Sequence, residues 1–217
     1  MRKRSGAGRP AACEVFGHRE RLLDIATEIF LEQGYKNAKI SEIANRAGAS
    51  KTTLYARYPT KAELFVAVIT RRTRVLQESF AEILIPGKPL EKVLDEFGAR
   101  LLLTMSHPEK RALYKVFVAE SSYFPKLARR FWEVGPKRSI GMLRDYLRGH
   151  PEFKGAYPEH AAEMFWSLCC GQSLLKSQLQ KSSLMSGKTI DFNVKEAVRI
   201  FLAAYAPTPS TIGAVKR

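Results

Sequence analysis

The sequence has no apolar run that could cross a membrane, and it has few cysteines. No segment reaches the roughly 18 consecutive apolar residues that a spanning helix needs. The basic start, MRKRSGAGRP, is followed by no hydrophobic signal core, so we do not expect secretion. The three cysteines, Cys13, Cys169 and Cys170, form no Cys-x-x-Cys pair. We therefore expect a cytoplasmic protein without a membrane partner.

Sequence signatures of catalysis are missing as well. There is no glycine-rich phosphate loop, no His-Glu-x-x-His pair and no nucleophile elbow. The four histidines are scattered and form no cluster with cysteines or carboxylates at metal-ligand spacing. We therefore predict that the protein is not an enzyme and needs no metal or cofactor. Cys169 and Cys170 lie in an apolar segment and are expected to pack as small hydrophobic residues, with a redox switch as the alternative.

The chain also lacks the alternating pattern of β-strands and any internal repeat. Apolar residues instead recur at helical spacing, and proline and glycine separate segments of helix length, such as 90–105 and 109–121. The first helix is expected from about residue 18 to 33. Its apolar stripe consists of Leu22, Ile25, Ala26, Ile29 and Phe30. We predict an all-α fold.

Positive charge is abundant. The formal net charge is +15, and residues 1–75 carry 15 Lys and Arg against 7 Asp and Glu. The excess is therefore densest toward the N-terminal end, as a module that binds a polyanion requires. A generally basic and solubilising surface is the alternative interpretation.

Two short helical segments separated by a tight turn are expected near the N-terminal end. Gly34 can end the first long helix in a left-handed conformation, and a short helix follows at about residues 41–46. Gly48 permits a close turn, and Ser50 can cap a second short helix that runs to about Arg57. This arrangement is typical of a helix-turn-helix.

The second short helix suits the major groove of DNA. In a helix-turn-helix this helix enters the groove while the first crosses the phosphate backbone. Leu54 is expected to face the core, against Leu22 and Ile43, and Thr60 has the spacing of a capping box that opens the next helix. The side chains predicted to contact DNA are Lys51, Thr52, Thr53, Tyr55, Arg57, Tyr58 and Lys61.

One recognition helix reads too few base pairs for genomic specificity. We therefore expect a homodimer on a near-palindromic operator, with half-sites about 34–36 Å apart or a multiple of that. Residues 161–179 are apolar or small on nearly every face of their first half, and residues 194–205 carry an apolar stripe. Two such helices from each subunit would form a four-helix interface; core helices of a monomer are the alternative. The predicted interface residues are Phe165, Leu168, Leu175, Val198, Phe201 and Leu202.

The motif resembles the DNA-binding domain of the tetracycline-repressor (TetR) family of bacterial transcription regulators. The match covers about 45 residues. In register are Gly34 and Tyr35, Ile43 and Ala44, Ala47 and Gly48, Ser50, Leu54 and Tyr55, Tyr58, Thr60 and Lys61, and Leu64. The resemblance implies that Lys51, Thr52, Thr53, Tyr55, Arg57 and Lys61 contact DNA. It also implies an all-α homodimer whose C-terminal domain binds a small ligand and changes the spacing of two DNA-binding heads.

Two details of the N-terminal region bear on this resemblance. Ala38 stands where the family usually has a threonine that caps the first motif helix, a contact worth about 1 kcal/mol. Asn37 and Lys39 are the candidates to replace it. The segment around Arg9 resembles the family's basic N-terminal extension, in which arginine can enter the minor groove, so Arg9 joins the predicted DNA contacts. An unstructured solubilising tail is the alternative.

The C-terminal region resembles the AefR-like subclass of TetR C-terminal domains over residues 112–180, which identifies no ligand. A ligand pocket needs apolar and aromatic walls with a few polar groups. The candidates, each of which could instead be a plain core residue, are Phe97, Leu101, Met105, Tyr114, Phe117, Trp132 and Phe165.

Three parts are therefore expected: a basic disordered arm at 1–15, a three-helix helix-turn-helix domain at 16–62, and a larger helical ligand-binding and dimerisation domain at 63–217. The expected function is sequence-specific transcriptional regulation, as a repressor that a small-molecule inducer releases. The expected partners are double-stranded DNA, a second copy and an unidentified ligand. An architectural DNA binder is the alternative that charge alone favours. A shaped recognition helix and a large second body argue against it.

Overall fold

The computed structural model describes residues 12–179 and 185–206. Throughout these residues the chain forms α-helices and no strand, so the predicted all-α fold is confirmed. The chain divides into two compact units, Met1–Val68 and Ile69–Arg217, and the division falls inside helix α4 (Lys61–Ile83). In both described stretches, no helix is long and apolar enough to cross a membrane.

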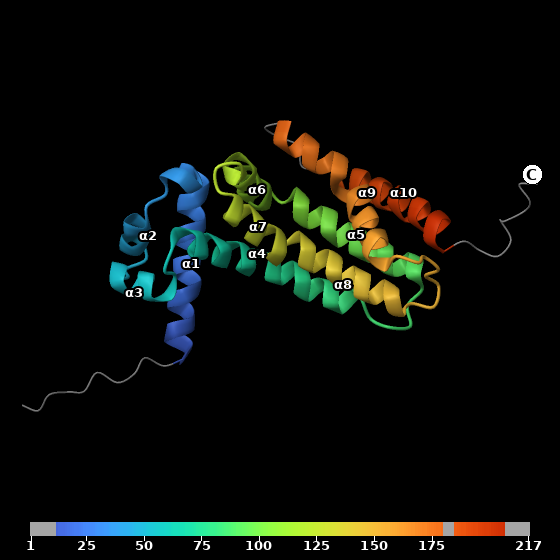
Figure 1. The fold of residues 1–217 in the computed structure, drawn as a ribbon, viewed down its shortest axis with the longest axis horizontal. Coiled ribbons are helices and arrows are strands. Elements are labelled where there is room, and N and C mark those ends of the chain that lie inside the picture. Colours follow the sequence, from blue (N-terminus) through green and yellow to red (C-terminus); the bar gives the residue numbers. More distant parts are fainter. Residues whose placement is uncertain (1–11, 180–184, 207–217) are drawn as a thin grey trace, which may run out of the picture. The chain divides into compact units, whose positions relative to one another are not determined.

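The N-terminal unit contains α1 (Ala12–Asn37), α2 (Ile40–Arg46), α3 (Lys51–Arg57) and the first turns of α4 (Figure 1). Residues 12–15 are helical, so the prediction that they belong to a disordered arm was wrong. Residues 12–15 contain no proline, and Ala12 and Glu14 favour helix. The remainder of the predicted arm, including Arg9, lies outside the described residues.

The end of α1 is set by a glycine and three aromatic rings. Gly34 has φ +75° and ψ 169°, a conformation that L side chains rarely adopt, so the predicted positive φ is confirmed, but the residue kinks α1 three positions before its end and is not a left-handed helical cap. The next residue, Tyr35, is buried, and its ring lies edge-on to Phe65 at 5.3 Å. Phe30 meets Phe65 in the same manner at 4.9 Å. Because edge-to-face rings pair favourably, these three side chains fix the end of α1 against the start of α4.

The C-terminal unit continues from α4 into a helical body. Pro108, Pro125 and Pro136 stand in the first turns of α6, α7 and α8, where a missing N–H costs nothing and the fixed φ suits a helix. Within this unit, α8 packs on α9, and α5 packs on both α9 and α10 (Figure 1). The helices are α5 (Leu90–Ser106), α6 (Pro108–Ser121), α7 (Pro125–Val134), α8 (Pro136–Gly149), α9 (Pro158–Leu179) and α10 (Gly187–Tyr205).

Aromatic residues form the centre of this unit. Phe80 and Phe97 are stacked with ring centroids 3.9 Å apart, and Phe165 meets Phe201 edge-on at 5.3 Å. All four are fully buried. They join α4, α5, α9 and α10 into one core.

A glycine and two cysteines allow α5 to approach α9 and α10 closely. A Cβ atom added at Gly98 would lie 3.0 Å from Val194 Cγ1 and 3.3 Å from Cys169 Sγ. Cys169 and Cys170 are both buried. Burial raises the pKa of Cys169 to about 12 and also raises the pKa of Cys170, so both thiols stay protonated. Their burial agrees with the prediction that they pack as small hydrophobic residues.

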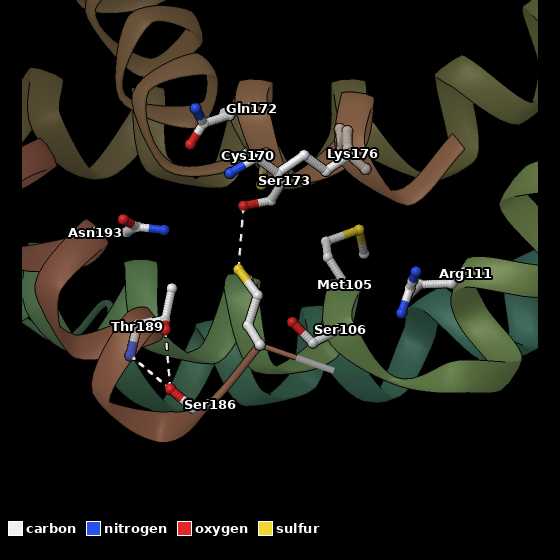
Figure 2. A pocket seen from close by; sticks show the side chains of 12 residues that line it. Met105, Ser106, Arg111, Cys170, Gln172, Ser173, Lys176, Ser186, Thr189 and Asn193 are labelled. Atoms are coloured by element: carbon white, nitrogen blue, oxygen red, sulfur yellow. Dashed lines mark hydrogen bonds between the residues drawn. The ribbon is translucent and has the colours of Figure 1, made fainter. Parts of the chain in front are cut away.

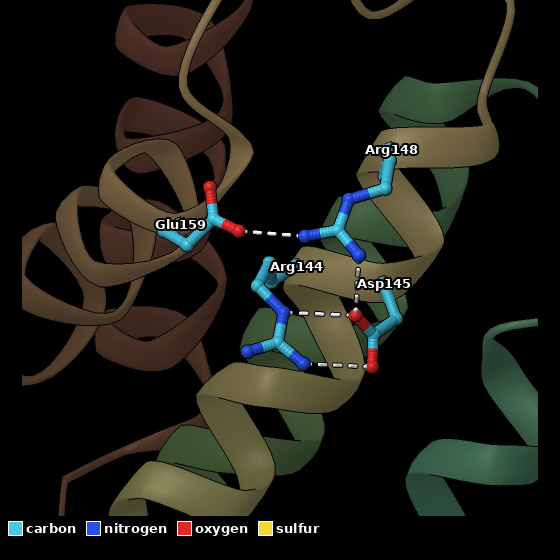
Figure 3. A network of polar contacts seen from close by, with 4 residues as sticks. All are labelled: Arg144, Asp145, Arg148 and Glu159. Carbon is cyan, nitrogen blue, oxygen red and sulfur yellow. Dashed lines mark hydrogen bonds and ion pairs between the residues drawn. The ribbon is translucent and has the colours of Figure 1, made fainter.

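A surface network links the end of α8 to the start of α9 (Figure 3). Arg148 Nη2 lies 2.6 Å from Glu159 Oε1, and Asp145 accepts two bonds from Arg144 at 2.8 and 3.0 Å. The hydrogen bond from Arg144 lowers the pKa of Asp145. These side chains are largely exposed, so we assign the network a role in orientation and only a small stabilising contribution.

The predicted dimer residues divide into two groups. Phe165, Val198 and Phe201 are buried in the unit's own core, so the prediction that they face a partner was wrong. Leu202 is half-buried. The physical reason is that α9 and α10 already bury one face each against α5. The apolar side chains that α9 and α10 leave exposed include Met164, Leu168, Leu175 and Ile200.

Candidate nucleic-acid interface

The turn between α2 and α3 is closed by backbone hydrogen bonds. Ala47 N donates to Ile43 O at 3.0 Å, and Ala49 N donates to Ala44 O at 2.9 Å. Gly48 between them has φ +66°, which suits the close turn predicted at this residue. Ser50 then caps α3, because its Oγ accepts from Thr53 N at 3.0 Å. The predicted capping residue is confirmed, and α3 is held at a fixed angle behind α2.

The two faces of α3 differ in the way that a recognition helix requires. Leu54 is 2% exposed and packs inward, as predicted. The opposite face carries exposed side chains, and Tyr55 is 47% exposed. This face offers cationic groups, hydroxyls and a methyl group to a groove edge. Of the predicted contacts, those exposed on α3 are Lys51, Thr52, Thr53, Tyr55 and Arg57.

The hydroxyl group of Thr53 also contributes to the cap of α3. Its Oγ1 lies 2.8 Å from Ser50 Oγ, so its hydroxyl takes part in the cap of α3. A threonine hydroxyl has one donor and two acceptor positions, so it can still meet a base while bonded to Ser50. The methyl group of Thr53 is not needed for the cap.

Tyr58 was predicted to contact DNA, and the structure contradicts this prediction. It is the C-cap residue of α3, only 8% exposed. Its hydroxyl oxygen is buried and has no hydrogen-bond partner among the residues that the structure describes. The helix has ended at this position, so the side chain no longer follows the exposed face of α3. Tyr58 therefore packs within the N-terminal unit and is not presented on the exposed face of α3.

Lys61 was also predicted to contact DNA, but its ammonium group has structural partners. Nζ donates to the backbone oxygens of Lys36 at 2.8 Å and Ala38 at 3.0 Å. It also lies 4.9 Å from the ring centroid of Tyr35. A cation at the carboxyl end of α1 satisfies carbonyls that the helix leaves unpaired. Lys61 is therefore a clamp between α1 and α4.

The N-terminus of α2 has no side-chain cap. Its N-cap residue is Lys39, one position after Ala38, and its side chain makes no capping hydrogen bond. The side chain of Asn37 donates to Gln33 O at 3.2 Å instead. Neither suggested replacement for the missing threonine therefore caps the helix. Lys39 is exposed beside the free N–H groups of α2, a position where a phosphate would be attracted. The available sequence signal for this position is a lysine two residues before the predicted short helix at 41–46.

Polar contacts fix α2 against α1. Gln33 Nε2 donates to Glu42 at 3.0 Å, and Arg46 lies 3.1 Å from Glu42 and 3.3 Å from Glu32. Because these groups are partly or largely exposed, each pair adds little stability on its own. Arg46 offsets part of the negative charge of the two carboxylates, and Gln33 adds a neutral hydrogen bond to Glu42.

The predicted ligand residues do not form one pocket. A cavity of about 460 Å³ lies among the end of α5, α6, the second half of α9 and the start of α10 (Figure 2). Met105 is the predicted residue that lines it. Phe97, Leu101 and Phe165 are fully buried core, and Trp132 is 47% exposed. The remaining two belong to an aromatic cluster on α6 and α7 made of Tyr114, Phe117 and Phe131.

Two protein-family models match the chain. The model described as "Bacterial regulatory proteins, tetR family" matches residues 22–68. The model described as "AefR-like transcriptional repressor, C-terminal domain" matches residues 92–207, more than half of the chain. The two matches cover the helix-turn-helix and most of the C-terminal unit.

Curated relatives are named as transcription regulators. The activator FasR of Mycolicibacterium smegmatis is 43% identical over 76 residues, which are 32% of this chain and 35% of FasR. The regulator SrpR of Pseudomonas putida is 26% identical over 150 residues, which are 69% of this chain and 68% of SrpR. This chain thus spans about a third of FasR and about two thirds of SrpR.

Solved structures share the fold over nearly their whole length. The flavonoid-responsive regulator FrrA is 31% identical with a TM-score of 0.74, covering 88% of this chain and 98% of FrrA. A TetR-family regulator from Mesorhizobium loti has a TM-score of 0.76 at 22% identity, with the same coverage.

Proposed function

Because the chain belongs to the tetR family of bacterial regulatory proteins, with an AefR-like C-terminal domain, we propose that it is a ligand-released repressor. It binds a near-palindromic operator as a homodimer in the cytoplasm, and a small-molecule inducer lowers its affinity for that operator. The match of residues 92–207 to a repressor domain supports repression over activation.

The observation that carries this proposal is the exposed face of α3. A turn closed at Gly48 and a cap at Ser50 present this face, while Leu54 holds the helix to the core. A helix supported in this way reads base edges in the major groove. The contacts that we propose are Lys51, Thr52, Thr53, Tyr55 and Arg57 of α3, with Lys39 at the N-cap of α2 on the phosphate backbone.

The dimer is proposed to use the outer faces of α9 and α10. Leu168 is 41% exposed and Leu175 is 61% exposed, seven residues apart and so on one side of α9. The exposure of Leu168 and Leu175 supports their predicted place in the interface, and we add the exposed Met164 and Ile200 to the proposal. A symmetric pairing of these faces would match the two-fold symmetry of an operator.

The inducer is proposed to be a small organic molecule bound by the C-terminal unit. The related protein FrrA is named flavonoid-responsive, which supports a response to a small molecule in this chain as well. An inducer works only if it binds the released conformation more tightly than the operator-bound one.

Fluorescence anisotropy on two DNA duplexes tests the function. One duplex comes from the DNA that flanks the protein's own gene, and the other has the same composition in scrambled order. We expect at least about a 10³-fold preference for the first at physiological salt. Equal affinity for both would reject a sequence-specific regulator. It would favour an architectural binder, whose affinity depends on salt concentration but not on the order of the bases.

A further inference from the structure

The cavity among α5, α6, α9 and α10 is polar and positively charged. Arg111 from α6 and Lys176 from α9 line it, and none of its described lining residues is a carboxylate. Met105, Leu174 and Met185 add an apolar wall. Its volume of about 460 Å³ lies within the range of about 300–1,000 Å³ found for small-molecule pockets. The cavity therefore has the size and the charge to hold a small anion with an apolar part.

Ser106, the last residue of α5, supplies a second and independent sign of a ligand. It is only 8% exposed and lines the cavity. Its hydroxyl oxygen is buried and has no hydrogen-bond partner among residues 12–179 and 185–206. Buried polar groups in proteins are as a rule paired, because an unpaired one loses its bonds to water. A ligand in the cavity can supply the missing bond.

The wall formed by α9 and α10 adds donors without adding negative charge. Ser186 caps α10 by accepting from Thr189 N at 3.1 Å, so the positive end of the α10 dipole lines the cavity. Asn193 follows one turn later on the same helix. Ser173 donates to Met185 Sδ at 3.2 Å, and sulfur is a weak acceptor that a ligand oxygen can replace. In Figure 2, Asn193 and Thr189 lie across the cavity from Arg111.

We propose that this cavity binds a small organic acid, with its carboxylate held by Arg111 and the hydroxyl of Ser106. The apolar part of the acid contacts Met105 and Leu174, and Lys176 adds positive charge to the site. This inference rests on the proposed function, since it names the chemical class of the inducer. An arginine fork matches a carboxylate with two parallel bonds, so an acid gains a charge-assisted contact that its neutral amide does not.

Thermal unfolding of the full chain with matched acid and amide pairs tests the proposal. The set pairs aromatic and aliphatic carboxylic acids with their primary amides, for example 4-hydroxycinnamate with 4-hydroxycinnamamide and octanoate with octanamide. We expect at least one acid to raise Tm by about 2 °C or more while its amide does not. No shift with any acid, or equal shifts with acid and amide, would overturn the proposal.

Three variants locate the effect. Arg111→Gln should abolish the acid's shift. Ser106→Ala should weaken acid binding several-fold yet leave the Tm of the free protein unchanged, because its hydroxyl has no partner to lose. Lys126→Gln, which removes an equal charge from an exposed position of α7, should keep the full shift. An acid-induced shift that survives Arg111→Gln would place the site elsewhere.

A neutral flavonoid separates this proposal from the function on which it rests. If naringenin raises Tm equally in the wild-type protein and in Arg111→Gln, and no acid does so, the acid proposal fails while a ligand-responsive regulator stands. Operator binding without any ligand tests the regulator itself. Equal affinity for the promoter and scrambled duplexes would reject that function whatever the cavity binds.

Discussion

Replacing Lys61 by methionine should loosen the N-terminal unit. The Lys61 ammonium donates to the carbonyls of Lys36 at 2.8 Å and Ala38 at 3.0 Å, and it lies 4.9 Å from the ring centroid of Tyr35. Methionine retains most of the aliphatic stem but removes the charge and all three donors. The carbonyls at the end of α1 would then lose their link to α4.

The expected cost follows from these contacts. A hydrogen bond to a charged group contributes about 1.5–3 kcal/mol. Both bonds depend on one partly exposed ammonium group, so we expect a loss of about 1.5–3 kcal/mol in total instead of twice that value. At about 1.4 kcal/mol for each factor of ten, amide hydrogen exchange around the end of α1 should accelerate roughly 10- to 150-fold.

Hydrogen exchange followed by mass spectrometry measures this effect in peptides from residues 34–46. Peptides from α9 serve as an internal reference and should not change. Lys51→Met is the matched control, because Lys51 is exposed on α3. It should leave hydrogen exchange unchanged. In a plot of the logarithm of the DNA-binding constant against the logarithm of salt concentration, it should reduce the slope by about one unit. Wild-type exchange in Lys61→Met, combined with the loss of one unit of slope, would refute the structural role and restore Lys61 as a phosphate contact.

Three further experiments test other parts of the molecule. Thr53→Val keeps the methyl group and Thr53→Ala does not, so in competition binding the alanine variant should lose more of the ratio of operator to random-DNA affinity; equal losses would assign the effect to the hydroxyl. Leu168→Glu should give a folded monomer by light scattering and circular dichroism, whereas Phe201→Glu should unfold the C-terminal unit because it places a charge in the core. Cys169 and Cys170 should resist alkylation by iodoacetamide at pH 8 in the native protein, because burial raises the pKa of both thiols, that of Cys169 to about 12. Both should be alkylated after denaturation. Rapid alkylation of the native protein would show that the thiols are accessible.

The helix-turn-helix was predictable because its determinants are local. Gly48 needs a positive φ, Ser50 accepts a bond from a residue three positions later, and Leu54 is the one apolar side chain pointing inward from α3. Each of these requirements acts over at most a few residues, so residue type and spacing are sufficient to state it. The same holds for the prolines that open α6, α7 and α8.

The roles of Lys61 and Tyr58 were not predictable in the same way. Lys61 bonds to backbone oxygens 23 and 25 positions earlier in the chain. Tyr58 is buried because α3 has ended one residue before it. In the sequence, a basic or phenolic side chain near a recognition helix suggests contact with DNA. The sequence does not show whether that side chain is exposed or is already bonded or buried within the protein. Only the packed positions of α1 and α4 distinguish the two cases.

The proposed ligand site shows a related limit that has a physical cause. Large aromatic side chains bury the most apolar area, so they contribute most to stability when they pack in the core. Phe97 and Phe165, which were predicted to line a pocket, are both fully buried in the core. A cavity between helix ends is left to small polar residues such as Ser106, Ser173 and Asn193. These residues follow no apolar period and belong to three different helices. If the proposed site is right, the sequence signal for the ligand is a basic residue in an early turn of one helix together with polar residues at helix ends, since Arg111 and Ser106 line the same cavity.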